Sequence, residues 1–162
     1  MEKEEYVTVE KVVKIPVNES AGWYRSKFFT MMRDEGKIMA NKCPRCNRII
    51  IPPRVICVYC KVEIPDIQDN WVELSDKGTI VDSQTIQERE QDEITGELIG
   101  QPNPNIFIRL DGSDEWCLFG HISEEMDPDK VKEGVRVQAV WKPKEQREGR
   151  VSDILYFRII DE

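Results

Sequence analysis

Two short cysteine motifs decide how this chain folds: Cys43-Pro44-Arg45-Cys46 and, after ten further residues, Cys57-Val58-Tyr59-Cys60. Each C-x-x-C motif can form a tight turn, or knuckle, whose two sulfur atoms point at one centre. Two knuckles together supply a tetrahedral shell of four thiolates, which leaves no open position for water or substrate. The spacing therefore predicts a structural metal site whose ligands are Cys43, Cys46, Cys57 and Cys60.

Other uses of the four cysteines remain open from spacing alone. Two disulfides would require an oxidising compartment, but residues 1–5 are acidic and carry no apolar secretion signal. Redox exchange would need only one C-x-x-C motif. Zinc is the expected ion, although iron is also bound by four thiolates in rubredoxin-like sites. Because the chain has no run of about 18 apolar residues, we expect a cytoplasmic protein without a membrane span.

The residues between and beside the knuckles complete a small metal-dependent unit. Residues 49–51 are all isoleucine and form a short apolar strand that Pro52-Pro53 ends. Asn47 follows the first knuckle, at a position where the backbone often has to be left-handed and asparagine is tolerated. We expect residues 37–65 to form a zinc ribbon that cannot hold a core without its metal.

A helix is predicted directly before the ribbon, over residues 21–35. Asn18 and Ser20 are candidate caps at its start, and Gly36 stands where a C-cap glycine belongs. Its large apolar side chains are too many for a free amphipathic helix. Either they pack on their own domain, or they form a contact stripe for another subunit, where methionine and aromatic residues are favoured. The residues expected at such a partner interface are Trp23, Tyr24, Phe28, Met31 and Met32.

The rest of the chain has the pattern of β-structure. Residues 6–17 alternate and suit an edge strand, and short apolar strands separated by turn residues follow Pro65. Five or six short strands with one helical turn, at residues 127–132, fit a small closed barrel such as an OB-fold. The strands are expected at 71–76, 79–88, 105–111, 115–122, 135–142 and 154–160, with a hairpin or a long loop at 89–104.

These elements predict a mainly β fold with an N-terminal helix, in which a zinc ribbon is followed by an OB-fold barrel. We expect three parts: an N-terminal strand and helix at residues 1–36, the ribbon at 37–65 and the barrel at 66–162.

Charge is distributed unevenly along the 162 residues, whose net charge is −8. Residues 41–65 carry a net +4, whereas residues 66–162 carry a net −12. So acidic a chain is a poor general binder of nucleic acid or of an anionic membrane. The basic island contains Arg45, Arg48 and Arg54, whose guanidinium groups match phosphate or carboxylate oxygens. These arginines either contact a ligand or an acidic partner, or form an ordinary solvated face.

Few residues are left for nucleophilic catalysis. Cys117 lies in an apolar, strand-like run and is expected to be a small buried side chain, and His121 is the only histidine. On a regular strand the two residues would lie about 13 Å apart, at ~3.3 Å per residue. A Cys–His pair needs hydrogen-bond reach of about 3 Å. The sequence therefore favours a protein that works by docking.

Taken together, these motifs resemble a known family. The order of helix, glycine, ribbon, Pro-Pro and tryptophan is similar to that of the small proteins of domain of unknown function thirty-five. In that family an N-terminal helix precedes a rubredoxin-like zinc ribbon and an OB-fold; here Asn47 and Lys61 replace the glycines usual after each knuckle. The resemblance is carried by Phe28-Phe29, Glu35-Gly36-Lys37-Ile38, the two cysteine motifs, Ile51-Pro52-Pro53-Arg54, Trp71-Val72-Glu73 and Lys77-Gly78-Thr79-Ile80.

The resemblance implies a partner protein and not a stand-alone catalyst. Members of the family are similar to accessory subunits of thiolase-superfamily enzymes, including acetoacetyl-CoA thiolases, steroid side-chain aldolases and thiolases of aromatic-acid breakdown. There the thiolase-like chain supplies the catalytic cysteine and histidines, while the small subunit stabilises it and shapes or covers the acyl-CoA site. The implied partner is a thiolase-like catalytic subunit, and the implied ligand of the complex is a CoA thioester.

Two further functions remain open at this point. A nucleic-acid-binding module is one, because zinc ribbons and OB-folds both occur in such proteins. The other is a rubredoxin-like electron carrier, which would require iron in place of zinc.

Overall fold

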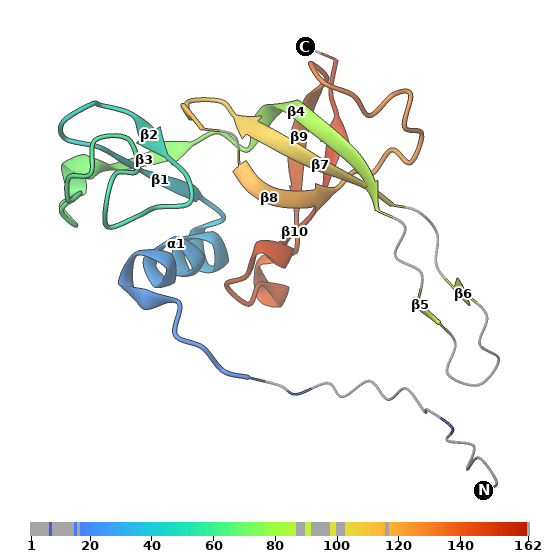
Figure 1. Ribbon diagram of the computed structural model, residues 1–162, viewed down its shortest axis with the longest axis horizontal. Helices are drawn as coiled ribbons and strands as arrows, with labels where there is room; N and C mark the ends of the chain where they lie inside the picture. Colours follow the sequence, from blue (N-terminus) through green and yellow to red (C-terminus); the bar gives the residue numbers. More distant parts are fainter. Residues whose placement is uncertain are drawn as a thin grey trace, which may run out of the picture.

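The computed structural model describes residues 7, 15, 17–86, 90–91, 98–99, 103–115 and 117–161. Within these residues the chain forms one α-helix, a three-stranded sheet, a curled five-stranded antiparallel sheet and a two-stranded hairpin (Figure 1). The predicted fold class is confirmed: the protein is mainly sheet, with one N-terminal helix followed by a ribbon region and a curled sheet. Among the described residues, no helix is long and apolar enough to cross a membrane.

Helix α1 spans Gly22–Glu35, close to the predicted bounds. Ser20 acts near its start, where its Oγ accepts a hydrogen bond from the Gly22 N–H at 3.3 Å, although the N-cap residue is Ala21. Gly36 ends the helix with a φ of 69°, the left-handed conformation expected of a C-cap glycine. A Cβ atom at Gly36 would also lie only 2.6 Å from a guanidinium nitrogen of Arg147.

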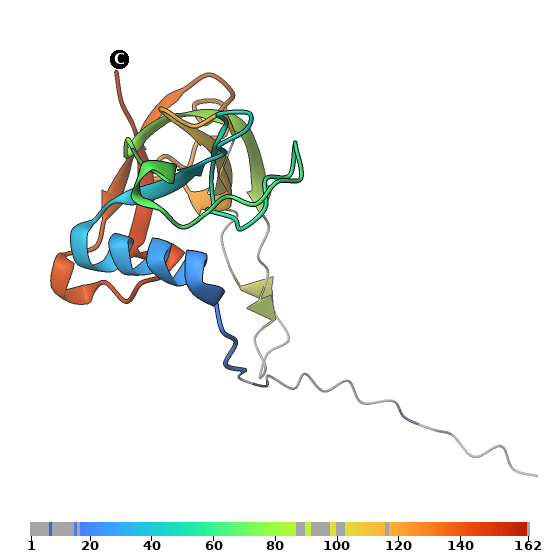
Figure 2. The same ribbon diagram turned by 90° about the vertical axis from the view of Figure 1, so that its left-hand side faces the viewer.

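The ribbon sheet contains β1 (Ile38–Lys42), β2 (Ile49–Ile50) and β3 (Trp71–Leu74), in the order β2-β1-β3. Both views show α1 lying below this sheet (Figures 1 and 2). The buried side chain of Asn41 fastens the following loop to the sheet, because it donates to the Arg54 carbonyl at 2.7 Å and accepts from the Arg54 N–H at 3.3 Å. The Pro-Pro loop therefore has a fixed position against β1.

The curled sheet has the strand order β10-β9-β4-β7-β8, with every neighbouring pair antiparallel. A single parallel bridge between Ser123 and Phe157 joins its two edges. This closing contact supports an OB-fold barrel, which stays a prediction. All five strands begin and end within two residues of the predicted bounds. They are β4 (Lys77–Ile86), β7 (Asn103–Leu110), β8 (Cys117–Ile122), β9 (Arg136–Trp141) and β10 (Ile154–Ile159).

Shorter elements complete the described chain. Between β4 and β7, β5 (Glu90–Gln91) pairs with β6 (Leu98–Ile99), so the stretch 89–104 contains a hairpin, which is one of the two predicted alternatives. The edge strand predicted for residues 6–17 lies outside the described residues, apart from residues 7, 15 and 17. Three 3-10 turns lie at Gln68–Asn70, Lys144–Gln146 and Val151–Asp153.

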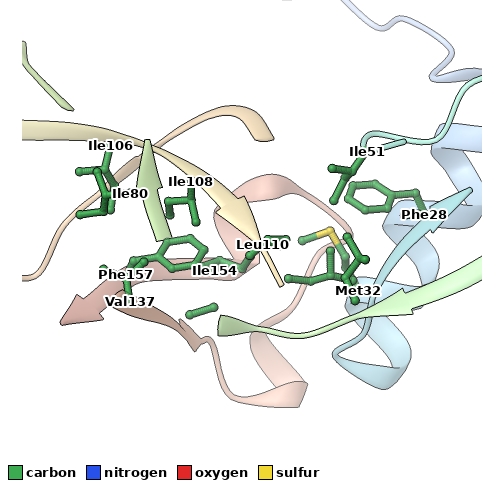
Figure 3. Close-up of a cluster of buried hydrophobic side chains, with 14 of the residues drawn as sticks. Phe28, Met32, Ile51, Ile80, Ile106, Ile108, Leu110, Val137, Ile154 and Phe157 are labelled. Atoms are coloured by element: carbon green, nitrogen blue, oxygen red, sulfur yellow. The ribbon is translucent and has the colours of Figure 1, made fainter. Parts of the chain in front are cut away.

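One hydrophobic core joins the helix, the ribbon sheet and the curled sheet. Figure 3 shows Phe28 of α1 beside Ile51 of the ribbon, and Met32 belongs to the same buried cluster as Leu110 and Ile154 of the curled sheet. Phe28 and Met32 are each only 2% exposed. We therefore expect the helix and the curled sheet to unfold together, whereas the division of the chain at residues 36 and 65 stays a prediction.

Replacement of Phe28 by alanine should lower the free energy of unfolding by about 3–5 kcal/mol, because it removes a buried ring and leaves a cavity. Leu155→Ala is the matched control, since Leu155 is 44% exposed, and its cost should be below about 1 kcal/mol. The measurement is urea unfolding followed by both circular dichroism and tryptophan fluorescence. Two separate transitions, or equal costs for the two variants, would contradict a shared core.

Candidate metal centre and the groove beside it

The two cysteine motifs form turns of the same backbone geometry. In each turn the first cysteine N–H donates to the carbonyl five residues later, and its own carbonyl accepts from the N–H four residues later. These bonds fold each C-x-x-C motif so that both sulfur atoms face the same point. The four bonds, each 2.9 Å, are Cys43 N–H to Arg48 O, Asn47 N–H to Cys43 O, Cys57 N–H to Val62 O and Lys61 N–H to Cys57 O.

Each turn needs one residue with a left-handed backbone. Asn47 has a φ of 58° and Lys61 a φ of 56°, and these are the described non-glycine residues with positive φ. The prediction for Asn47 is confirmed, and Lys61 occupies the equivalent position of the second turn. A lysine there costs about 1–2 kcal/mol relative to glycine, so the rest of the ribbon must hold this conformation.

The four sulfur atoms gather as a metal site requires. All lie within 4.8 Å of one another. The Cys43 and Cys60 sulfurs are 3.4 Å apart, and those of Cys46 and Cys57 are 3.8 Å apart. A disulfide bond is about 2.05 Å long, whereas a tetrahedral ion with bonds of about 2.3 Å sets sulfurs about 3.8 Å apart. The residues therefore fit a tetrahedral four-thiolate metal ion.

The thiols differ in how readily they ionise. Burial opposes ionisation of Cys43, but the backbone N–H groups of Cys46 and Arg45 outweigh it and lower the pKa to about 6. Burial raises the pKa of Cys60 to about 12, and its contact with Cys43 acts in the same direction. All four thiols can therefore be ionised at once only when a cation lies among them, and binding of that cation would release protons.

Replacement of Cys43 or Cys57 by serine should remove most of the bound metal, because three thiolates no longer close the tetrahedral shell. Cys117→Ser is the matched control and should keep it, since Cys117 lies on β8, outside the ribbon. The measurement is the metal-to-protein ratio by inductively coupled plasma mass spectrometry. Full metal content in Cys43→Ser or Cys57→Ser would remove that residue from the ligand set.

The carboxylate of Asp66 fastens the start of α1 to the ribbon. It accepts hydrogen bonds from the indole N–H groups of Trp23 and Trp71, the latter at 2.7 Å, and lies 2.8 Å from the ammonium group of Lys27. Lys27, Trp23 and Trp71 together lower the pKa of Asp66 to about 2. Since this folded-state pKa lies below the unfolded value of about 3.9, the contribution of Asp66 to stability is complete above pH 4 and is lost toward pH 2.

Two aromatic side chains extend this contact. The ring of Tyr24 stacks on that of Trp71, with centroids 5.8 Å apart, and its hydroxyl donates to the Ile64 carbonyl at 2.6 Å. The Lys27 ammonium lies 4.3 Å from the Trp71 ring centroid. The helix is thus held to the ribbon by polar and aromatic contacts as well as by the core.

Asp66→Ala should lower the midpoint of thermal unfolding at pH 7, because it removes the acceptor shared by two indoles and an ammonium group. A loss of 1 kcal/mol corresponds to about 2–4 °C in a chain of this size. Asp69→Ala is the matched control, since Asp69 is exposed and has no described ion pair, and should change the midpoint little. Equal midpoints for the two variants, measured by calorimetry, would contradict this role of Asp66.

The structure divides the five residues predicted at the partner interface. Phe28 and Met32 lie in the core of the chain itself, so the prediction that they face a partner is corrected: both pack against the ribbon and the curled sheet. Tyr24 and Met31 are half-buried, and Trp23 is 68% exposed. Hence the inner face of the helix serves the core, and its first turn is the part that remains open.

The three arginines of the basic island also separate. Arg45 and Arg48 are exposed on the first turn, where the Arg48 guanidinium lies 4.3 Å from the centroid of the Tyr59 ring. Arg54 is half-buried and lines a groove beside the helix. Their role as contacts for CoA or for a partner stays a prediction.

Sequence reasoning did not find this groove, which has a volume of about 440 Å³. We call it the α1 groove, because the first turn of α1 forms one wall and the Pro-Pro loop forms the other. The sequence contains both walls, as a Trp-Tyr-Arg run at the start of the helix and a Pro-Pro-Arg loop in the ribbon. It does not indicate that these two segments face each other, which only the folded structure shows. The lining residues are Ala21, Gly22, Trp23, Tyr24, Arg25, Pro52, Pro53, Arg54 and Val55.

A family model matches the part of the chain that holds the metal centre. Residues 32–66 match the family model described as "ChsH2, rubredoxin-like zinc ribbon domain". The match covers the four-sulfur site of the ribbon and the end of α1. The resemblance stated from the motifs is therefore confirmed for the ribbon, and zinc is the metal that the model's description names.

Solved structures share the fold beyond the ribbon. A protein of unknown function from the DUF35 family of Sulfolobus solfataricus matches at a TM-score of 0.54 and 22% identity, over 82% of this chain and 81% of that one. The structure described as the Ltp2-ChsH2(DUF35) aldolase matches at a TM-score of 0.56 and 16% identity, over 88% of this chain and 98% of that one. No curated protein matches the sequence. These likenesses show that the chain shares the fold of these DUF35 structures.

Proposed function

We propose that the protein is a non-catalytic accessory subunit of a thiolase-superfamily enzyme, which stabilises the catalytic subunit and helps to form or cover its acyl-CoA site. The observation that carries the proposal is the extent of the match to the Ltp2-ChsH2(DUF35) aldolase, which spans 88% of this chain and 98% of that one. A chain of that shape, found in an aldolase that is named for two components, supports a role within a complex.

The chemistry of this chain supports the same role. The four ribbon cysteines form a closed site, which as a zinc site would be structural, because no coordination position is left for a substrate. Thiolase chemistry needs a nucleophilic cysteine and an acid–base histidine within hydrogen-bond reach. Outside the ribbon the sequence offers Cys117 and His121, both on β8, and their side chains lie outside the described part of the structure.

The reaction of the proposed complex is thiolytic cleavage or condensation of a 3-oxoacyl-CoA, with aromatic-acid degradation as one pathway in which such a complex would serve. The catalytic subunit would supply the nucleophile and the acid–base groups, whereas this chain supplies a rigid surface. A nucleic-acid-binding role is disfavoured, because residues 66–162 carry a net −12 and phosphates would be repelled.

The test is purification of the chain from its own host, followed by native mass spectrometry and identification of its companions. We expect a larger thiolase-superfamily subunit, and thiolysis of 3-oxoacyl-CoA by the complex but not by this chain alone. Cys43→Ser is the informative variant: with its ribbon loosened, it should recover less of the larger subunit than Cys117→Ser does. A chain that is isolated without a partner, or that turns over a thioester by itself, would contradict the proposal.

A further inference from the structure

We infer that the α1 groove is the site at which the catalytic subunit docks, through a segment that carries a carboxylate flanked by apolar side chains. This inference rests on the proposed function and names the surface that such a partner would cover.

Exposed large apolar side chains gather beside the α1 groove. Trp23 and Val55 line it and are 68% and 48% exposed, while Ile56 and Ile67 are 55% and 53% exposed. In contrast, the much longer stretch 68–161 has two such residues among those described, Met126 and Leu155. Clustered apolar exposure of this kind marks an interaction surface.

Hydrogen bonds and a β-bridge connect these side chains into one region. Trp23 bonds to Asp66, which directly precedes Ile67. On the other side, the Val55 carbonyl accepts the Ile64 N–H at 2.8 Å, and Ile56 forms a bridge with Glu63. The segments 55–56 and 63–67 therefore lie side by side, and they connect the groove wall at Val55 to Asp66, which binds the indole of Trp23. The exposed apolar side chains thus belong to neighbouring segments of the ribbon.

The charge of the groove selects an anionic group in the partner. Arg25 is exposed and Arg54 half-buried, and neither forms an ion pair with any residue that the structure describes. Many other basic side chains do pair; Arg136 with Asp111 and Arg158 with Glu124 are examples, both at 2.7 Å. The first turn of α1 contains no acidic residue either. Two guanidinium groups without a described ion pair, in a chain of net charge −8, thus line the groove, and a carboxylate of the partner could pair with either of them.

A protein segment fits this region better than a small phosphate ligand. Arg25 and Arg54 would receive the phosphates of a ligand equally well, but Ile56 and Ile67 lie outside the lining of the groove. A ligand that fills the groove leaves both isoleucines exposed to water. A protein surface would cover them together with Trp23 and Val55, which adds apolar burial to the ion pairs.

The first experiment uses the two-subunit complex and a charge-reversal pair, Arg25→Glu with Arg54→Glu. We expect the dissociation constant for the catalytic subunit, measured by biolayer interferometry, to rise at least about tenfold. The matched control is Arg109→Glu with Lys132→Glu, which makes the same change in net charge at two exposed residues of the curled sheet region and should change it less than about twofold. Metal content and unfolding temperature verify that both variants fold.

A second experiment identifies the docked segment. A photo-reactive benzoylphenylalanine in place of Trp23 should cross-link to a peptide of the catalytic subunit that contains Asp or Glu beside apolar residues. Reversal of that carboxylate to arginine should restore binding to the Arg25→Glu, Arg54→Glu variant. A cross-linked peptide without a carboxylate would overturn the inference.

The remaining outcomes separate the two proposals. If both charge-reversal pairs bind the catalytic subunit as the unchanged chain does, the groove is not the docking site, while the accessory role stands. Docking at the groove is likewise excluded if CoA, used as the probe in calorimetry, binds the unchanged chain and not the Arg25→Glu, Arg54→Glu variant while the complex stays intact. If no thiolase-superfamily subunit accompanies the unchanged chain, the proposed function itself fails.

Discussion

Four sulfur atoms within 4.8 Å of one another hold a ribbon that has little else at its centre. The hydrophobic cluster of the ribbon consists of Ile50 and Ile64 together with Cys43 and Cys57, so half of its buried members are candidate metal ligands. Two isoleucine side chains cannot offset the conformational entropy of ordering nearly thirty residues. A bound ion would add its stability to that of Ile38, Ala40 and Ile51, which the ribbon contributes to the shared core, and the loop opposite α1 would depend on both.

The ribbon is not an isolated module, because the helix ties it to the curled sheet. Phe28 and Met32 of α1 are buried in the same cluster as Ile80 and Phe157 of the curled sheet. At the N-terminal end of the helix, Asp66 binds the indole N–H groups of both Trp23 in the first turn and Trp71 in β3, and so connects the helix to this strand. The helix wall of the α1 groove is thus held by two sets of contacts. The inner face of the helix packs in the core, and Asp66 binds its first turn, so the wall is a rigid surface.

Much of the fold could be predicted because its signals are local. The metal ligands follow from cysteine spacing, the left-handed Asn47 from its place after a turn, and the strands of the curled sheet from alternation between turn residues. Gly36 ended the helix as predicted, because the C-cap conformation is set by one residue and its neighbours.

The inward and outward sides of α1 could not be predicted in the same way. Trp23 and Phe28 are both large and apolar and lie about 140° apart around the helix, but the sequence does not say which of the two sides faces inward; the first is 68% exposed and the second 2% exposed. The tertiary contacts settle the matter: Phe28 packs in the shared core, whereas the indole N–H of Trp23 bonds to Asp66, 43 positions away in sequence. Likewise the α1 groove joins segments about thirty residues apart, and only the packing of the helix on the ribbon brings them together.

The close approach at Gly36 links two regions of the chain that sequence alone would treat as independent. Arg147 reaches back from the C-terminal third, where its side chain donates to the Lys142 carbonyl at 2.9 Å and lies over the ring of Trp141. Its guanidinium occupies the space that any larger residue at position 36 would need. Among homologous chains, positions 36 and 147 should therefore vary as a pair: a side chain at the first requires a shorter or differently directed one at the second.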